Sequence, residues 1–233
     1  MIDWLLAMLL ILVLPGFAIW RSLHPRAKPA SRMRRYWHSI AYVVVLLLLL
    51  ATSWWSAGRT LPQLGLGWPF TRGAAIGLIV FVALSAIILT ISHFKTRKLT
   101  PEAKAELKAK APGSDMLPQN PHELAVFLLL AVLLGCGWEL LYRGFLWWFL
   151  APRVGTVGAI CIAALAYGFG HGVKQRQQAI GSIVSAFAFM VAFVLTHSLW
   201  WLMLIHTAMP LAGGLSAWRG WHRSDDTVPN AEA

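Results

Sequence analysis

Two oppositely charged residues, Glu139 and Arg143, lie inside the apolar segment GCGWELLYRGFLWWFL at residues 135–150. Each charge costs about 2.5 kcal/mol or more near the centre of a bilayer, so ionisable residues there are functional candidates by default. Four residues apart, the two side chains share one face of a helix. They could form a structural salt bridge, or Glu139 could supply a carboxylate for proton transfer.

Two histidines extend this set of candidate residues. His171 follows YGFG, whose glycines allow close helix packing, and His206 lies within SLWWLMLIHTAMP. Either histidine alone could be a hydrogen-bonded packing residue, but a carboxylate, a guanidinium and two imidazoles together favour catalysis. With Glu139 the histidines also have the composition of a zinc site. Because no His-Glu-x-x-His motif is present and Glu139 already has Arg143 as a partner, we expect no cofactor.

The elements that must position these residues are membrane helices. The chain of 233 residues is 58% hydrophobic and 12% charged, about half the charged fraction of a soluble domain. Its apolar blocks are long enough to cross a bilayer, which takes about 20 residues per helix. The sequence therefore predicts an all-α, multi-pass transmembrane bundle. The expected spans are 3–20, 37–57, 73–93, 122–150, 155–171, 179–196 and 198–218.

Lysine and arginine gather on one side of this seven-span arrangement. That side holds the basic residues at positions 21, 26, 28, 32, 34, 35, 95, 97, 98, 104, 108, 110, 174, 176, 219 and 223, against 59, 72 and 153 on the other. Because cytoplasmic loops carry such an excess, we expect the N-terminus outside and the C-terminus in the cytoplasm, in the cell (inner) membrane.

The same bias explains the formal net charge of +11 by attraction to anionic lipid headgroups. Membrane lipids are thus the expected partners, and no segment is typical of a nucleic-acid-binding module. We divide the chain into an N-terminal three-span region (1–121), a core (122–218) and a disordered tail (219–233). Cys136 and Cys161 lie in apolar segments and are interpreted as packing residues, not as a disulfide.

The polar segments of the core resemble the three motifs of the CPBP intramembrane proteases, the group of CAAX prenyl proteases and bacteriocin-processing enzymes. That family has two adjacent glutamates followed by three residues and Arg, then Phe, three residues and His, and last His, three residues and Asn or Asp. WELLYRGFL, YGFGH and SLWWLMLIHTAMP follow this order within residues 122–215. The resemblance implies peptide hydrolysis by an activated water within the membrane.

The resemblance also assigns roles to four catalytic candidates. Glu139 matches the second glutamate, Arg143 the arginine, and His171 and His206 the two histidines. It implies that Glu139 is the carboxylate, held by Arg143. His171 would polarise the water and His206 would help to stabilise the oxyanion. The expected substrate is a membrane-associated peptide, with prenylated peptides among the candidates.

Three positions depart from the family pattern. Trp138 stands where the first glutamate is expected, Tyr167 replaces Phe, and Pro210 replaces Asn or Asp. The added hydroxyl of Tyr167 is a mild change. An indole has no basic atom and proline has no donor, so a base and an oxyanion partner are missing. Glu139 could take over as base, although it lies about 100° around the helix from position 138.

Three functions therefore stay open. The chain could be an active endopeptidase, or a pseudoprotease that binds membrane peptides without cutting them, in immunity or regulation. The third interpretation is a proton-coupled transporter, against which the absence of an inverted repeat and the order of the motifs argue.

The predicted spans also contain a conflict about depth. At about 1.5 Å per residue, Glu139 and His206 fall in the outer half of the bilayer and His171 nearer its inner face. A single site needs these side chains together. We expect them to converge in one pocket, as the resemblance implies. The fifth span would then start later or bend, or the topology would differ from the predicted one by an element.

Overall fold

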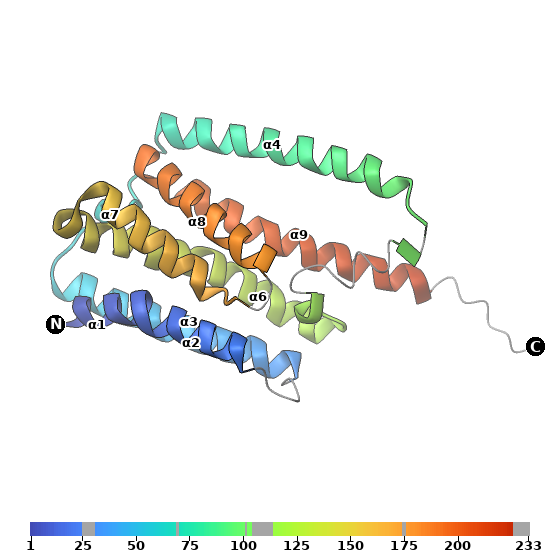
Figure 1. The fold of residues 1–233 in the computed structure, drawn as a ribbon, viewed down its shortest axis with the longest axis horizontal. Coiled ribbons are helices and arrows are strands. Elements are labelled where there is room, and N and C mark those ends of the chain that lie inside the picture. Colours follow the sequence, from blue (N-terminus) through green and yellow to red (C-terminus); the bar gives the residue numbers. More distant parts are fainter. Residues whose placement is uncertain (25–30, 69, 101, 104–113, 174–175, 226–233) are drawn as a thin grey trace, which may run out of the picture.

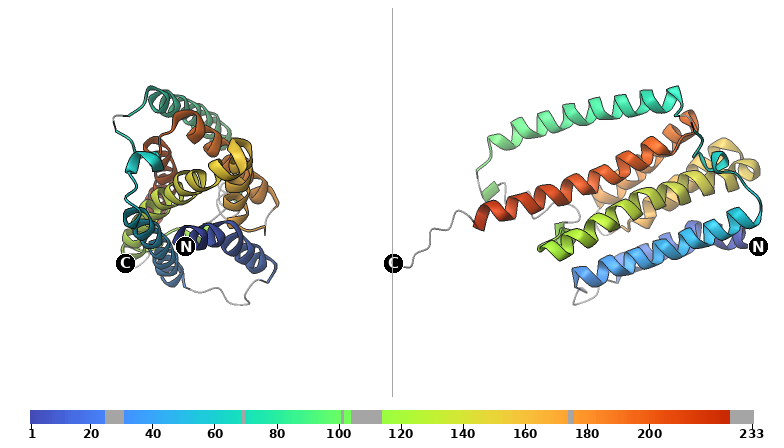
Figure 2. Two further views of the ribbon diagram at one scale, coloured as in Figure 1. Left: turned by 90° about the vertical axis from the view of Figure 1, so that its left-hand side faces the viewer. Right: turned by 180° about the vertical axis from the view of Figure 1, so that it is seen from behind.

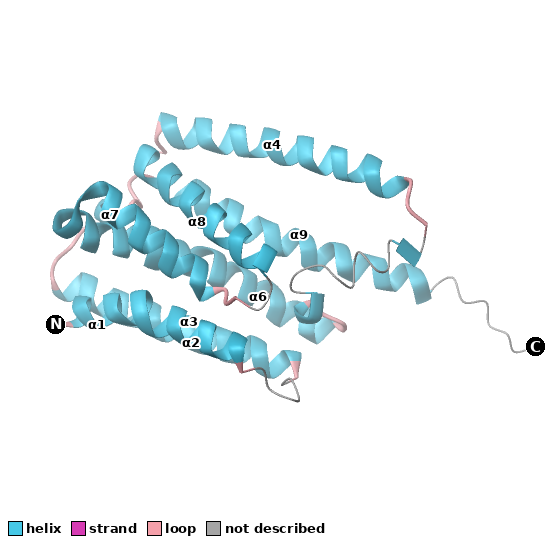
Figure 3. Cartoon of the chain, in the orientation of Figure 1, coloured by secondary structure: helices cyan, strands magenta, loops and turns pink. Residues whose placement is uncertain are grey.

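The computed structural model describes residues 1–24, 31–68, 70–100, 102–103, 114–173 and 176–225, which form helices and no strand (Figure 3). The long helices are α1 (Ile2–Met8), α2 (Leu14–Leu23), α3 (Arg32–Ser56), α4 (Arg72–Arg97), α6 (Pro121–Trp138), α7 (Leu146–Gly170), α8 (Arg176–Thr196) and α9 (Trp200–Asp225). Two π-helical turns, η1 (Leu9–Val13) and η4 (Glu139–Phe145), join helices end to end. The 3₁₀ turns η2 (Leu61–Leu64) and η3 (Ser114–Met116) lie in connections. The prediction of an all-α bundle is confirmed.

Five helices of the described chain are long and apolar enough to cross a membrane. They are Ile2–Leu23, Arg32–Ser56, Arg72–Lys95, Pro121–Gly170 and Arg176–Thr196. The chain is therefore a multi-pass membrane protein. Many large apolar side chains point outward, as a lipid environment allows; Ile79 and Leu89 of α4, for example, are 68% and 69% exposed.

The 50-residue helix from Pro121 to Gly170 is not one straight rod. Gly155 has a φ of +74°, a left-handed value that suits glycine, and Pro152 lies just before it. A continuous helix would separate Tyr142 from Tyr167 by about 38 Å, whereas their ring centroids are 5.2 Å apart. The chain therefore reverses near Gly155, at the boundary predicted between residues 150 and 155, and forms two legs (Figure 1).

The returning leg of α7 is short, and its length fixes where His171 lies along the bundle. Residues 156–170 span about 22 Å, less than the roughly 30 Å of a hydrocarbon core. Its end lies part-way along the bundle, while α3, α6 and α9 extend farther (Figures 1 and 2). His171 follows this end directly and so lies part-way along the bundle, short of the end that α3, α6 and α9 reach.

The starts of α3 and α6 are tied together at the end of the bundle opposite the N-terminus (Figure 1). Asn120 caps α6, its side chain accepting a hydrogen bond from the Glu123 backbone at 2.8 Å, and Pro121 occupies the first turn. Arg32 of α3 donates to the Glu123 carboxylate at 3.0 Å. This contact fixes the register between two helices of the bundle.

The end of α9 and the state of the two cysteines can be compared with the predictions from the sequence. α9 continues to Asp225, past residue 219 where the disordered tail was predicted to begin, and residues 226–233 lie outside the described residues. Cys136 and Cys161 are both free.

Candidate active site

Glu139 is the first residue of the π-helical turn η4, at the point where α6 ends. Its side chain is completely buried. Oε1 accepts a hydrogen bond from His206 Nδ1 of α9 at 2.7 Å, so residues 67 positions apart meet directly. Oε2 is also buried and has no hydrogen-bond partner among the described residues, which leaves its acceptor capacity unused. Single π-helical turns inside α-helices are frequent at functional sites.

Arg143 lies next to this carboxylate and is itself buried. Its Nη1 is 3.3 Å from Glu139 Oε1, so the two charges form the ion pair that the sequence suggests. Its guanidinium carbon lies 4.1 Å from the ring centroid of Tyr167 and 5.5 Å from that of Phe189. A guanidinium between two aromatic faces is stabilised by the ring quadrupoles, most strongly where water is excluded.

Tyr167 connects the second histidine to the first. Its Oη lies 3.0 Å from His206 Nε2, and its backbone oxygen accepts a hydrogen bond from His171 Nδ1 at 3.1 Å. The rings of Tyr167 and His171 meet at 4.8 Å between centroids. Glu139, Arg143 and His206 thus form one contact group, and His171 joins it through Tyr167.

The crossing of α6 and α9 brings His206 to Glu139. A Cβ built on Gly135 would lie 2.8 Å from both the backbone N and the Cα of Thr207, the neighbour of His206. Such distances are too short for any side chain, so glycine at 135 permits the close approach of the two helices. Cys136 contacts the same threonine, with its Sγ 3.7 Å from Thr207 Oγ1.

Alanine at position 135 is expected to push α9 away and to destabilise the protein by about 1–3 kcal/mol, as overpacking does. The measurement is equilibrium unfolding of the purified protein in mixed micelles. Gly181→Ala is the matched control, because a Cβ at Gly181 meets nothing within 4 Å. Equal unfolding curves for the two variants would contradict a tight crossing at Gly135.

Trp138 and Pro210 replace the first glutamate and the last Asn or Asp of the family motifs. The Trp138 ring packs against Tyr42 of α3 and Tyr142 of η4, each at 5.7 Å between centroids. It fills space on the α3 side and carries no group that could accept a proton. Pro210 lies in α9, four residues after His206, and is half-buried.

The two histidines of the site contact other protein atoms. Three ligands would have to face one ion, and the described residues contain no such group of His, Cys, Asp and Glu. His206 Nδ1 contacts Glu139 and His206 Nε2 contacts Tyr167, so both ring nitrogens already have protein partners. His171 Nδ1 contacts a backbone oxygen.

Comparison with known families identifies this part of the chain. Residues 120–212, less than half of the chain, match the family model described as Type II CAAX prenyl endopeptidase Rce1-like. This match supports the assignment of the segment to the CPBP family that its motifs resemble. No curated protein and no solved structure matches the chain. All four candidate residues of the CPBP core lie in the matched segment, and the match favours the endopeptidase family over the transporter interpretation.

Sequence reasoning missed one residue of this site. Tyr167 reads as a mild replacement of the CPBP phenylalanine, yet its hydroxyl contacts His206 and its ring faces Arg143. The signal available in the sequence was a hydroxyl four residues before His171, at a position where the family has none.

Proposed function

We propose that the chain is an intramembrane endopeptidase that hydrolyses a peptide bond of a membrane-associated substrate with an activated water. The observation that carries this proposal is the fully buried Glu139 carboxylate, hydrogen-bonded to His206 and paired with Arg143. Burying charges is costly unless they are paired, and sites that need strong proton acceptors and donors accept this cost.

The residues of this site can divide the chemistry between them. Glu139 supports His206 from one side, and a carboxylate–imidazole pair in a low-dielectric site is a suitable proton acceptor. Arg143 adds a fixed positive charge close to where negative charge develops on the substrate carbonyl. His171, at the end of the short leg of α7, is exposed and thus accessible to substrate and water.

An apolar groove on the N-terminal helices supports an apolar or lipid-modified substrate. It has a volume of about 420 Å³ and lies between η1, α2 and α3. Aliphatic side chains line it, together with His38 and Tyr42. Tyr42 of this groove also packs against Trp138, on the side of α6 that faces α3. The apolar lining of this groove suits an isoprenyl or acyl chain attached to a peptide.

The test uses the full chain in liposomes and a panel of peptides that are prenylated, acylated or membrane-spanning. The expected result is cleavage, with ¹⁸O from labelled water incorporated into the new carboxyl group. Faster cleavage of the prenylated peptide than of its unmodified counterpart is expected if the groove binds the lipid. Absence of cleavage of every peptide would contradict the endopeptidase function.

A pseudoprotease is the second candidate, favoured by the packing of Trp138 between Tyr42 and Tyr142, where no base is available. It predicts that the chain binds membrane peptides without cutting them. Restoring the family residues in the double variant Trp138→Glu, Pro210→Asn should then create cleavage.

For the membrane orientation, we propose the N-terminus outside and the C-terminus in the cytoplasm, as the basic residues indicate.

A further inference from the structure

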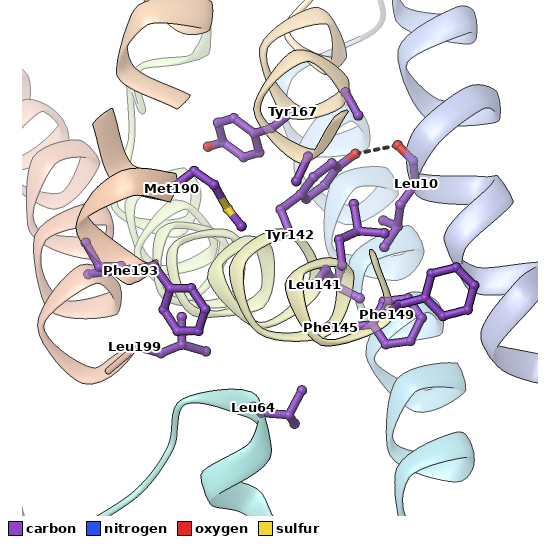
Figure 4. Close-up of a cluster of buried hydrophobic side chains, with 14 of the residues drawn as sticks. Leu10, Leu64, Leu141, Tyr142, Phe145, Phe149, Tyr167, Met190, Phe193 and Leu199 are labelled. Atoms are coloured by element: carbon purple, nitrogen blue, oxygen red, sulfur yellow. Dashed lines mark hydrogen bonds between the residues drawn. The ribbon is translucent and has the colours of Figure 1, made fainter. Parts of the chain in front are cut away.

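The Tyr167 side chain is held in place on several sides. It is 7% exposed, its ring lies edge to face with Tyr142, and the Arg143 guanidinium lies 4.1 Å from its ring centroid. Figure 4 shows the rings of Tyr142 and Tyr167 side by side with their hydroxyls pointing to opposite sides. The Tyr142 hydroxyl donates to the Leu10 backbone oxygen at 3.1 Å, whereas that of Tyr167 faces His206.

The direction of the hydrogen bonds follows from the chemistry of the groups. Glu139 forms an ion pair with Arg143 through Oε1, and the carboxylate of such a pair can only accept hydrogen bonds. His206 therefore carries a proton on Nδ1 and donates it to Glu139. In the neutral imidazole Nε2 then holds a lone pair, so the Tyr167 hydroxyl donates to it. The result is a continuous carboxylate–imidazole–hydroxyl chain.

We propose that Tyr167 is a catalytic residue that passes the proton of the attacking water to His206. As the water oxygen bonds to the substrate carbonyl carbon, its proton moves to Tyr167 Oη, while the Tyr167 proton moves to His206 Nε2. The imidazolium is stabilised by Glu139. When the C–N bond breaks, the proton returns through Tyr167 to the leaving amine, so the side chains end as they began.

This inference rests on the proposed endopeptidase function and explains how hydrolysis proceeds without the first glutamate. Trp138 cannot accept a proton, and Glu139 reaches the substrate only through His206. A carboxylate that orients an imidazole, which in turn deprotonates a hydroxyl, is an established way to activate an attacking oxygen. Here the hydroxyl is on Tyr167 and His206 acts as the base, in place of the oxyanion role that the resemblance implied.

The test is Tyr167→Phe, which removes one oxygen and restores the usual family residue. General acid–base groups contribute about 10²–10⁴-fold, so kcat should fall by about 10²-fold or more, with KM and peptide binding unchanged. Tyr142→Phe is the matched control, since it removes a neighbouring hydroxyl that points away from His206; kcat should stay within about twofold. Unchanged peptide binding by Tyr167→Phe reports a folded protein.

A second variant separates a proton relay from a packing role. His206→Gln should lower kcat at least as much as Tyr167→Phe, and the double variant should lose no more than His206→Gln alone, because residues that act as one unit are not additive. If the kcat losses of the two single variants multiply in the double variant, the two residues act independently and the relay is overturned. Full activity of Tyr167→Phe would also overturn it and leave the endopeptidase function standing, whereas no cleavage by the unmodified chain would overturn the function itself.

Discussion

Glutamine in place of Glu139 is expected to lower kcat by about 10³–10⁴-fold while the protein stays folded and binds peptide. The amide has nearly the shape of the carboxylate and still accepts a hydrogen bond from His206, but it carries no charge to stabilise an imidazolium. Replacing the orienting carboxylate of a carboxylate–imidazole pair by its amide costs about 10⁴-fold in a well-studied protease. The measurement is single-turnover cleavage of a fluorogenic membrane peptide in liposomes.

Glu123→Gln is the control for this substitution. Glu123 lies near the start of α6 and pairs with Arg32, far along the helix from η4. The Glu123→Gln variant should cleave the peptide at a rate within about threefold of that of the unmodified chain. Equal activity of Glu139→Gln and the unmodified chain would show that the buried carboxylate has a structural role only.

The membrane helices could be predicted from the sequence because long apolar runs have few alternatives to crossing a bilayer. The reversal near Gly155 was predictable for the same reason, since Gly and Pro interrupt an apolar block long enough for two spans. The end of the returning leg was predicted as well, since the expected span 155–171 and α7 both end beside His171. The link from this end to His206, which runs through Tyr167, was not predictable.

The contacts of the site were predictable only in part. The spacing of Glu139 and Arg143 indicates their ion pair, because both residues lie on one helix. The contact of Tyr167 with His206 joins two helices through their relative rotation, which no local pattern encodes. A hydroxyl added to a phenylalanine ring therefore read as a mild change, although it completes a hydrogen-bonded chain.

Arg143→Met is expected to destabilise the protein by about 3–5 kcal/mol. The substitution keeps an unbranched side chain, but it leaves the Glu139 carboxylate buried with His206 as its remaining partner. Removing one member of a buried ion pair strands the other charge in a low dielectric, and this desolvation cost dominates the loss. The stacking of the guanidinium on Tyr167 and Phe189 is lost as well. Equilibrium unfolding in mixed micelles measures the effect.

A second substitution tests whether the stranded charge is the cause. Glu139→Gln added to Arg143→Met removes that charge, so the double variant should be more stable than Arg143→Met alone. Arg35→Met is the control, because Arg35 pairs with the exposed Asp115 and such pairs contribute about 0–1 kcal/mol. Arg143→Met and Arg35→Met could lower the free energy of unfolding equally, or the added Glu139→Gln could restore no stability. Either result would show that Arg143 does not stabilise the charge of Glu139.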